Sequence, residues 1–169
     1  MPEFALDLAC GQRPQPGFLG VDIWPGADFQ VDLSRFPWPW DDSSVDKAVS
    51  VHYVEHVTDL IGFMNELWRI MKPGGHILIA HPYERHNHAW RDPTHVRALN
   101  EESWYYYSTE WRQAMGISHY PIVADFRIVD MKYVLDESLV SAGVNVTMED
   151  VHTKWNVCRE LQVEMETIK

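Results

Sequence analysis

Hydrophobic residues along the chain gather in short continuous runs that end on polar residues, glycine or proline. Five runs of strand length are Phe4–Ala9, Phe18–Ile23, Phe29–Leu33, Lys47–Val51 and His76–His81. Short uninterrupted apolar runs are typical of strands that are covered on both faces, as in a parallel sheet. The pattern therefore predicts a parallel sheet in the first half of the chain.

Apolar residues follow a different spacing in Asp59–Lys72, where they recur every three or four positions. This spacing predicts a helix with one buried face. Thr58 or Asp59 can cap its start, and the sequence Lys-Pro-Gly-Gly at 72–75 is expected to end it in a turn. A helix between two parallel strands makes a βαβ unit, with the right-handed crossover usual for such units.

The second half of the chain has other patterns. Residues 82–100 show no hydrophobic period and are rich in His, Arg and aromatic residues, which predicts a long loop or lid. Residues 101–115 are predicted to be helical, with Asn100 as a candidate cap. Phe126–Leu135 and Lys154–Ile168 are predicted strands, and the second alternates strictly between apolar and polar residues.

We expect these two strands to form an antiparallel pair, joined by the polar segment Asp136–Thr153. Together the patterns predict one α/β domain over residues 1–169. Its sheet is mostly parallel, it ends in the antiparallel pair, and it has few helices.

Composition narrows the classes of function. A chain of 169 residues fits a single domain. The formal net charge is −11 and the basic residues are scattered, which disfavours nucleic acid as a partner because phosphate binding needs clustered Lys and Arg. Cys10 and Cys158 form no disulfide framework or zinc signature. With no signal-peptide pattern and no membrane-spanning run, we expect a cytoplasmic protein without a membrane partner.

Candidate site residues follow from the predicted sheet, because ligands of open α/β sheets bind beyond the carboxyl ends of the strands. Residues at these ends are Asp7, Ala9, Cys10, Gly11, Asp22, Asp32, Leu33, Ser50, Val51, His52, Tyr53, Glu55, His56, His81, Pro82 and Tyr83. Gly11 lacks a Cβ and lets the backbone approach a ligand closely. Asp22 can accept hydrogen bonds from the two hydroxyls of a ribose.

Several phrases, in this order, resemble the class I S-adenosylmethionine-dependent methyltransferases, in particular the small type 11-like group. They are "LDLACG" at 6–11, "GVDI" at 20–23, "VDLSRFPWPWDDSSVDKAVSVHYVEHV" at 31–57, "LWRIMKPGGHILIAHP" at 67–82 and "RDPTHVRALN" at 91–100. The resemblance covers about residues 4–107. It implies a Rossmann-like fold, S-adenosylmethionine as cofactor, and methyl transfer to a small-molecule or saccharide acceptor.

The resemblance also implies where each ligand would lie. Implied cofactor-binding residues are Asp7, Ala9, Cys10, Gly11, Arg13, Asp22, Ile23, Asp32, Leu33, Ser50 and Val51. The acceptor would enter between the His52–His56 turn and the 81–97 loop, where Tyr53 and Tyr83 are candidate pocket residues. His52, His81 and His95 are candidates for a base or for the acceptor pocket, since an unperturbed imidazole titrates near neutral pH.

Three departures from the family pattern concern the first strands. Gly11 is followed by Gln12 and Arg13, so the second glycine of the family motif is missing. Only Cys10–Gly17 joins the first two strands, which leaves no room for the usual crossover helix. Arg13 is therefore predicted to replace the helix N-terminus as a cation for the cofactor carboxylate. No covering helix precedes the first strand, so one sheet face is expected to be partly bare, which favours a homodimer or a complex with a partner protein.

Two other classes of function stay open. A cofactor-free binding or assembly domain would fit the broken glycine motif and the missing helices. A metal-dependent enzyme would use the histidine-rich loop, whose imidazoles and carboxylates suit zinc, iron or manganese. That set is His81, His86, His88 and His95 with Glu84 and Asp92. Its spacing matches no metal motif, so no metal ligand is predicted.

Overall fold

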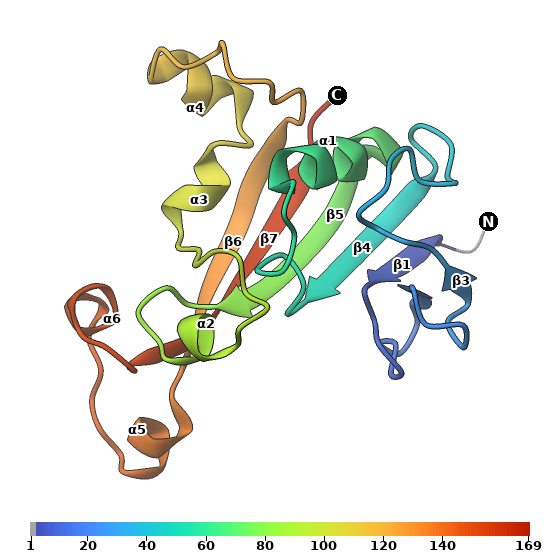
Figure 1. The fold of residues 1–169 in the computed structure, drawn as a ribbon. Coiled ribbons are helices and arrows are strands. Elements are labelled where there is room, and N and C mark those ends of the chain that lie inside the picture. The colour runs from blue at the N-terminus through green and yellow to red at the C-terminus, as the bar shows by residue number, and fades with distance from the viewer. Residues whose placement is uncertain (1–2) are drawn as a thin grey trace.

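One seven-stranded sheet organises residues 3–169, the part of the chain that the computed structural model describes (Figure 1). The strands are β1 Ala5–Leu8, β2 Leu19–Asp22, β3 Phe29–Gln30, β4 Val45–Val51, β5 Met71–Pro82, β6 Phe126–Leu135 and β7 Cys158–Thr167. Their order is β3-β2-β1-β4-β5-β7-β6. The first five are parallel, and β7 is antiparallel to both β5 and β6. The predicted mostly parallel sheet with a terminal antiparallel pair is therefore confirmed.

Apart from the first, the helices are short. They are α1 Leu60–Ile70, α2 His88–Arg91, α3 Glu102–Tyr105, α4 Thr109–Ala114, α5 Glu137–Ser141 and α6 Met148–Thr153. As predicted, α1 crosses from β4 to the parallel strand β5, and the Asp59 side chain caps it by accepting a hydrogen bond from Gly62 N. The glycine turn predicted at 72–75 lies inside β5, where the register against β4 shifts and Gly74 has a φ of 72°.

The prediction of one helix over 101–115 is wrong, because two short helices, α3 and α4, occupy this segment. Ser108 between them is extended, and its hydroxyl accepts a hydrogen bond from Trp111 N as the cap of α4. The carbonyl of Tyr107 accepts a hydrogen bond from Phe126 N at the start of β6. This carbonyl is therefore bonded to the sheet, and the helix does not continue through Tyr107. The segment 82–100 is mainly loop, as predicted, with α2 as a single turn.

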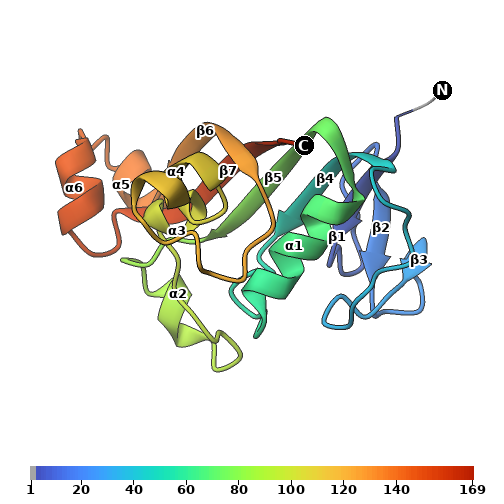
Figure 2. The same cartoon turned by 90° about the horizontal axis from the view of Figure 1, so that it is seen from above.

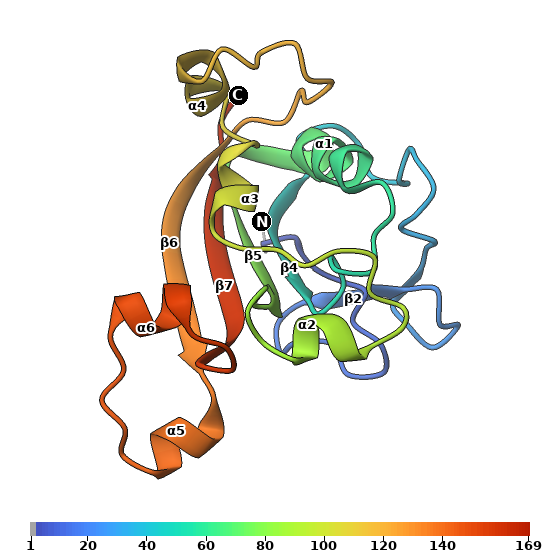
Figure 3. The ribbon, with the colours of Figure 1, turned by 60° about the vertical axis from the view of Figure 1, so that its left-hand side comes forward.

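The alternation of β7 is confirmed, since Leu161, Val163 and Met165 are fully buried while Gln162 and Glu164 between them are partly exposed. The strand begins at Cys158, not at Lys154. Asn156 has a φ of 57°, a left-handed conformation that a strand does not contain. The intervening segment 136–153 holds α5 and α6, which lie beyond the ends of β6 and β7 (Figure 3).

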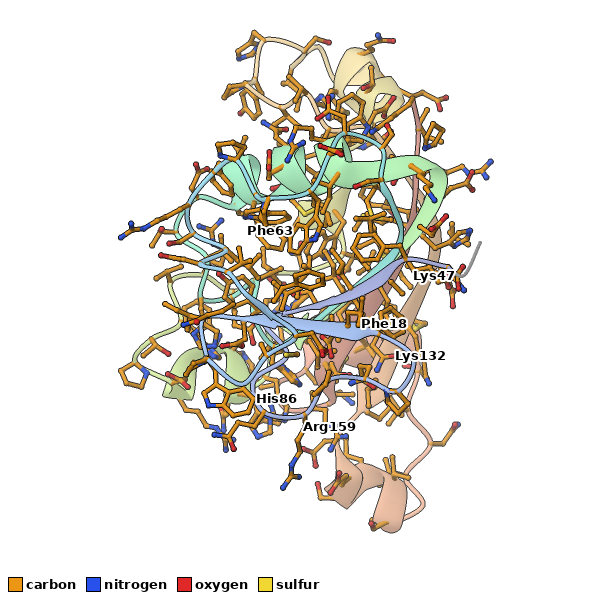
Figure 4. The ribbon with its side chains drawn as sticks, turned by 90° about the vertical axis from the view of Figure 1, so that its right-hand side faces the viewer. Phe18, Lys47, Phe63, His86, Lys132 and Arg159 are labelled. Atoms are coloured by element: carbon orange, nitrogen blue, oxygen red, sulfur yellow. The ribbon has the colours of Figure 1, made fainter. Side chains whose placement is uncertain are left out.

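The two faces of the sheet differ. Figure 2 shows α1, α2 and α3 on one side, and no helix of residues 3–169 covers the other. Figure 4 shows Phe63 on the α1 side and Phe18, Lys47 and Lys132 on the opposite side. Phe18 and Lys47 line a shallow hollow of about 420 Å³ on this bare face. None of the helices in the described residues has the length and apolar composition that crossing a bilayer requires.

Candidate functional site

The connection between β1 and β2 is a loop without a helix, held by a buried carboxylate. Asp7, only 3% exposed, accepts a hydrogen bond from Gln15 N at 2.7 Å through Oδ2. Burial raises the pKa of the Asp7 carboxyl. Ala9 and Gly11 have φ values of 61° and 57°, so the backbone turns sharply directly after the strand. Asp7 thus holds the loop between β1 and β2 through its hydrogen bond to Gln15 N, and its own side chain is not at the surface.

Asp22, at the end of β2, joins this loop to its own strand. Its Oδ2 accepts a hydrogen bond from Gly11 N and its Oδ1 accepts one from Trp24 N, both at 2.9 Å. A carboxylate has about four lone-pair sites, so each oxygen of Asp22 keeps a second one for a ligand. The two backbone bonds set the orientation of the carboxylate before any ligand arrives.

Beside Asp22 lies a cavity of about 220 Å³, on the helix-free loops beyond β1, β2 and β3. It is lined by Ala9, Asp22, Ile23, Val31, Asp32, Leu33 and Tyr53. Five of the predicted cofactor-binding residues are therefore brought together here. Asp32 accepts hydrogen bonds from the hydroxyl and the backbone N–H of Ser34, which lower the pKa of its carboxyl. Two carboxylates among apolar walls suit a sugar attached to a flat ring.

Other predicted cofactor residues lie outside the lining of this cavity: Asp7, Cys10, Gly11, Arg13, Ser50 and Val51. The Arg13 side chain is exposed and forms no ion pair within residues 3–169. Ser50 is 1% exposed, and its hydroxyl has no hydrogen-bond partner in this part of the chain. Burial and the carboxylates of Asp7 and Asp22 raise the pKa of the Cys10 thiol.

Two more cavities continue from the first in a row. One of about 250 Å³ is lined by Ser34, Phe36, Tyr53, His56, Val57, Thr58 and Asp59. One of about 280 Å³ is lined by His52, Glu55, His56, Pro82, His88, Arg91, Asp92 and His95. Tyr53 borders the first and second cavities, and His56 borders the second and third. The row therefore has room for two ligands, one on each side of the turn after β4.

Two of the predicted pocket residues are core residues instead. His81 is fully buried; its Nδ1 donates to the carbonyl of Pro82 and its Nε2 accepts from Trp104 Nε1. Burial lowers the pKa of His81 to about 4, so the ring is neutral and has no free nitrogen. Tyr83 is 1% exposed and donates its hydroxyl to Glu101, and burial raises the pKa of the phenol. Neither side chain reaches a cavity of the row.

His52 and His95 do line the third cavity, but their ring nitrogens have different partners. His52 Nε2 lies 2.9 Å from Glu160 Oε2, and this hydrogen bond, helped by Glu55, raises the pKa of His52 to about 9. His52 is therefore a cation at neutral pH and holds no lone pair for a proton. His95 directs Nδ1 to the carbonyl of Ala89 at 3.0 Å, which leaves Nε2 as an acceptor.

The set of metal-ligating residues suggested by the histidine-rich loop does not come together. His86 Nε2 pairs with Asp136, and Glu84 accepts a bond from Asn100. In residues 3–169 one group of three does converge, Glu55, His56 and His95, with one ligand atom from each within 4.8 Å of the others. Glu55 and His56 lie in the turn after β4, which ends at Val51, and a turn at the carboxyl end of a strand is typical of ligand-binding residues, so that signal was present in the sequence.

Comparisons with known proteins show which proteins this chain resembles. A family model described as a methyltransferase domain matches residues 18–79, from the start of β2 into β5. A protein of Mycolicibacterium smegmatis named "Probable S-adenosylmethionine-dependent methyltransferase" is 36% identical over 84 residues. The matched part is 47% of this chain, and the chain spans 30% of the length of that curated relative.

Solved structures show the same fold over nearly the whole chain. An S-adenosylmethionine-dependent methyltransferase from Archaeoglobus fulgidus has a TM-score of 0.69 at 17% identity, covering 98% of this chain and 86% of its own. A methyltransferase of Haloferax volcanii, solved with the activator Trm112, has a TM-score of 0.63 at 16% identity, with coverages of 99% and 83%. The [4+2]-cyclase SpnF has a TM-score of 0.61 at 16% identity, with coverages of 98% and 74%.

Proposed function

Since this chain has the fold of the class I S-adenosylmethionine-dependent methyltransferases and their family match in residues 18–79, we propose that it is a methyltransferase. It transfers the methyl group of S-adenosylmethionine to a small-molecule or saccharide acceptor. The observation that carries this proposal is the cavity beyond β1, β2 and β3, where Asp22 is oriented by two backbone N–H groups. The acceptor class rests on the size of the neighbouring cavities and the acidic net charge.

The residues around the first cavity fit the nucleoside part of the cofactor. The Asp22 carboxylate accepts hydrogen bonds from the ribose hydroxyls with the lone pairs that the backbone leaves free. Ile23 and Leu33 would contact the adenine, with Asp32 at its edge. Ile23 is 67% exposed, so its apolar side chain is accessible to a ligand. Bound there, the cofactor supplies an electrophilic methyl group on a sulfonium.

The other two cavities fit the acceptor. Tyr53 stands between the cofactor cavity and its neighbour, so its ring shapes the passage between donor and acceptor. Methyl transfer is an in-line displacement, and the chain contributes mainly by positioning two reactants and excluding water. Of the three histidines predicted as bases, His95 is the one with a free ring nitrogen toward these cavities.

Calorimetric titration with S-adenosylhomocysteine tests the cofactor site directly. We expect saturable binding to one site, weakened about tenfold to a hundredfold in Asp22→Ala because a charged hydrogen-bond acceptor is lost. The control is Asp41→Ala, an exposed acid outside the three cavities, which should bind like the wild type. A folded wild-type protein that shows no binding at millimolar ligand supports the non-catalytic alternative instead.

The acceptor class is tested with isotope-labelled S-adenosylmethionine and a panel of phenols, hydroxy acids and monosaccharides. Mass spectrometry should find the label in at least one acceptor, and the same panel with Asp22→Ala should give a lower rate. Methylation of a protein or nucleic acid but of none of the small molecules would contradict the proposed acceptor class. It would leave the cofactor site intact.

A further inference from the structure

Glu55 is a buried carboxylate without a hydrogen-bond partner, and it lines the 280 Å³ cavity. The residue is 3% exposed, and neither carboxylate oxygen has a hydrogen bond within residues 3–169. The nearest cation is His52, whose Nδ1 lies 3.5 Å from Oε1 without forming a hydrogen bond. Leaving a buried carboxylate in this state costs free energy, so an unsatisfied one indicates a missing ligand.

Two imidazoles face this carboxylate, and each is held by its other nitrogen. His95 Nδ1 bonds to the carbonyl of Ala89 at 3.0 Å, and His56 Nδ1 lies 3.0 Å from Thr94 Oγ1 and 3.3 Å from the Thr94 carbonyl. In both rings the remaining nitrogen is Nε2. Metal-ligating histidines commonly have this arrangement, in which a backbone carbonyl or hydroxyl fixes the tautomer and the ring direction.

The chain segments that carry the three residues are tied to each other. Val96 N donates to the carbonyl of Glu55 at 2.9 Å, and the Arg97 guanidinium donates to the carbonyl of Thr58. The rings of His56 and His95 meet edge to face with centroids 4.7 Å apart. The three ligand atoms are therefore held together by the packing of two loops.

We propose that Glu55, His56 and His95 bind one divalent first-row transition metal ion such as Zn²⁺. Two imidazoles and one carboxylate are the ligands such ions prefer, whereas Mg²⁺ and Ca²⁺ require mostly oxygen ligands. Three protein ligands leave coordination positions open, and the cavity lies on that side. The open positions take water or an oxygen donor such as a hydroxyl or carboxylate of a small molecule.

Charges around the three ligands act in both directions. Asp92 Oδ2 lies 4.0 Å from His95 Nε2 and adds negative charge beside the ion. Arg91 and the cationic His52 also line the cavity and oppose it. His52 Nδ1 lies 3.5 Å from Glu55 Oε1 and its Nε2 lies 2.9 Å from Glu160 Oε2, so a metal ion on Glu55 would leave the ring its hydrogen bond to Glu160.

This site is independent of the cofactor cavity, and only the identity of the oxygen donor rests on the proposed function. With a metal bound, His95 Nε2 is a ligand and no longer a base. An acceptor oxygen would then be oriented by the ion. Metal binding is measured without S-adenosylmethionine or acceptor, so failure here is distinguishable from failure of cofactor binding.

The test uses the full chain after treatment with a chelator and dialysis. Calorimetry with Zn²⁺ should show one site, and Glu55→Gln and His95→Gln should each weaken binding by about tenfold or more. His88→Gln is the matched control, because His88 lines the same cavity outside the group of three and should leave the dissociation constant unchanged. Thermal melting checks that each variant is folded.

X-ray absorption of the zinc-loaded wild type keeps the proposal falsifiable if a variant does not fold. It should show two imidazole nitrogens and oxygen ligands. Absence of one-site Zn²⁺ binding, binding unchanged in both folded variants, or sulfur ligation from Cys10 or Cys158 would each overturn the proposal.

Discussion

The ends of β1 and β2 and the adjacent end of β4 handle buried polar groups in opposite ways. Asp7 and Asp22 accept hydrogen bonds from the backbone of the loop between β1 and β2. Ser50 and Glu55, on and after β4, are buried like Asp7 but have no hydrogen-bond partner within residues 3–169; the nearest charged group to Glu55 is His52, 3.5 Å away. Groups of the first kind shape the loops. Groups of the second kind are available to a ligand at a cost in stability.

This difference predicts two kinds of effect, which variants can test. Replacing an internally bonded group should lower the free energy of unfolding. Replacing an unpartnered group should change stability little and affect ligand binding.

His81, at the end of β5, is an internally bonded group with a large expected effect. Its pKa is about 4 in the folded chain, mainly through burial, with smaller influences from Glu55, His52 and Glu160. Unfolding restores the ordinary value near 6.5, so below pH 6.5 the unfolded chain binds a proton that the folded chain excludes. Stability should therefore fall by about 3 kcal/mol from pH 6.5 to pH 4 because of His81 alone.

Urea unfolding of the wild type and His81→Gln at several pH values measures this contribution. Glutamine does not titrate, so the variant should lose about 3 kcal/mol less than the wild type over the same range. The exposed His119, changed to Gln, should keep the wild-type pH dependence. Parallel curves for the wild type and His81→Gln would show that the buried ring is not the source.

Asp7 separates the role of the hydrogen bond from that of the charge. Asp7→Ala leaves Gln15 N without its acceptor and should lower the free energy of unfolding by about 2 kcal/mol. Asp7→Asn keeps an acceptor oxygen and removes a buried charge, so we expect stability close to that of the wild type at pH 7. If Asn costs as much as Ala in urea unfolding, the charge itself is required.

Arg13 is predicted to act only on the ligand, because its side chain is exposed and forms no ion pair in the described chain. Arg13→Ala should leave the melting temperature unchanged. It should weaken the binding of S-adenosylhomocysteine by about 1 kcal/mol, or severalfold, because a surface cation near the carboxylate of the ligand is lost. Lys132→Ala on the bare face is the control. An unchanged dissociation constant for S-adenosylhomocysteine in Arg13→Ala would contradict the predicted role of Arg13 in cofactor binding.

Ser50 should show the smallest effect. Its hydroxyl is buried without a partner, so Ser50→Ala removes an unsatisfied group and should change the free energy of unfolding by about 0.5 kcal/mol or less, in the stabilising direction. If the hydroxyl contacts a ligand, the same variant weakens that ligand in calorimetry. A clear loss of stability without ligand would place Ser50 among the bonded groups.

Much of the fold could be predicted because burial leaves a local pattern. The alternation of Leu161, Val163 and Met165 matches a sheet with one covered face. The errors occur where a distant contact overrides local preference, as at Tyr107, whose carbonyl bonds to Phe126 and interrupts the expected helix. Ser108 did carry a local signal, since serine before a helical segment is a preferred cap.

The candidate site could be predicted only in part. Asp22 and Asp32 follow from their position at strand ends, but His81 was placed in a pocket although it continues the inward alternation of Ile77 and Ile79. The approach of His95 to Glu55 depends on how two loops pack, and no local pattern encodes it.

The short connection between β1 and β2 has a consequence for how the chain folds. A parallel pair usually closes across a unit of roughly 30 residues, whereas here residues 9–18 suffice. With its two strands the unit covers only residues 5–22, and because the entropy of loop closure grows with the logarithm of length, this lowers the closure cost by about 0.5 kcal/mol. The β1–β2 pair can thus form between near neighbours in sequence, a contact of low sequence separation that favours early pairing.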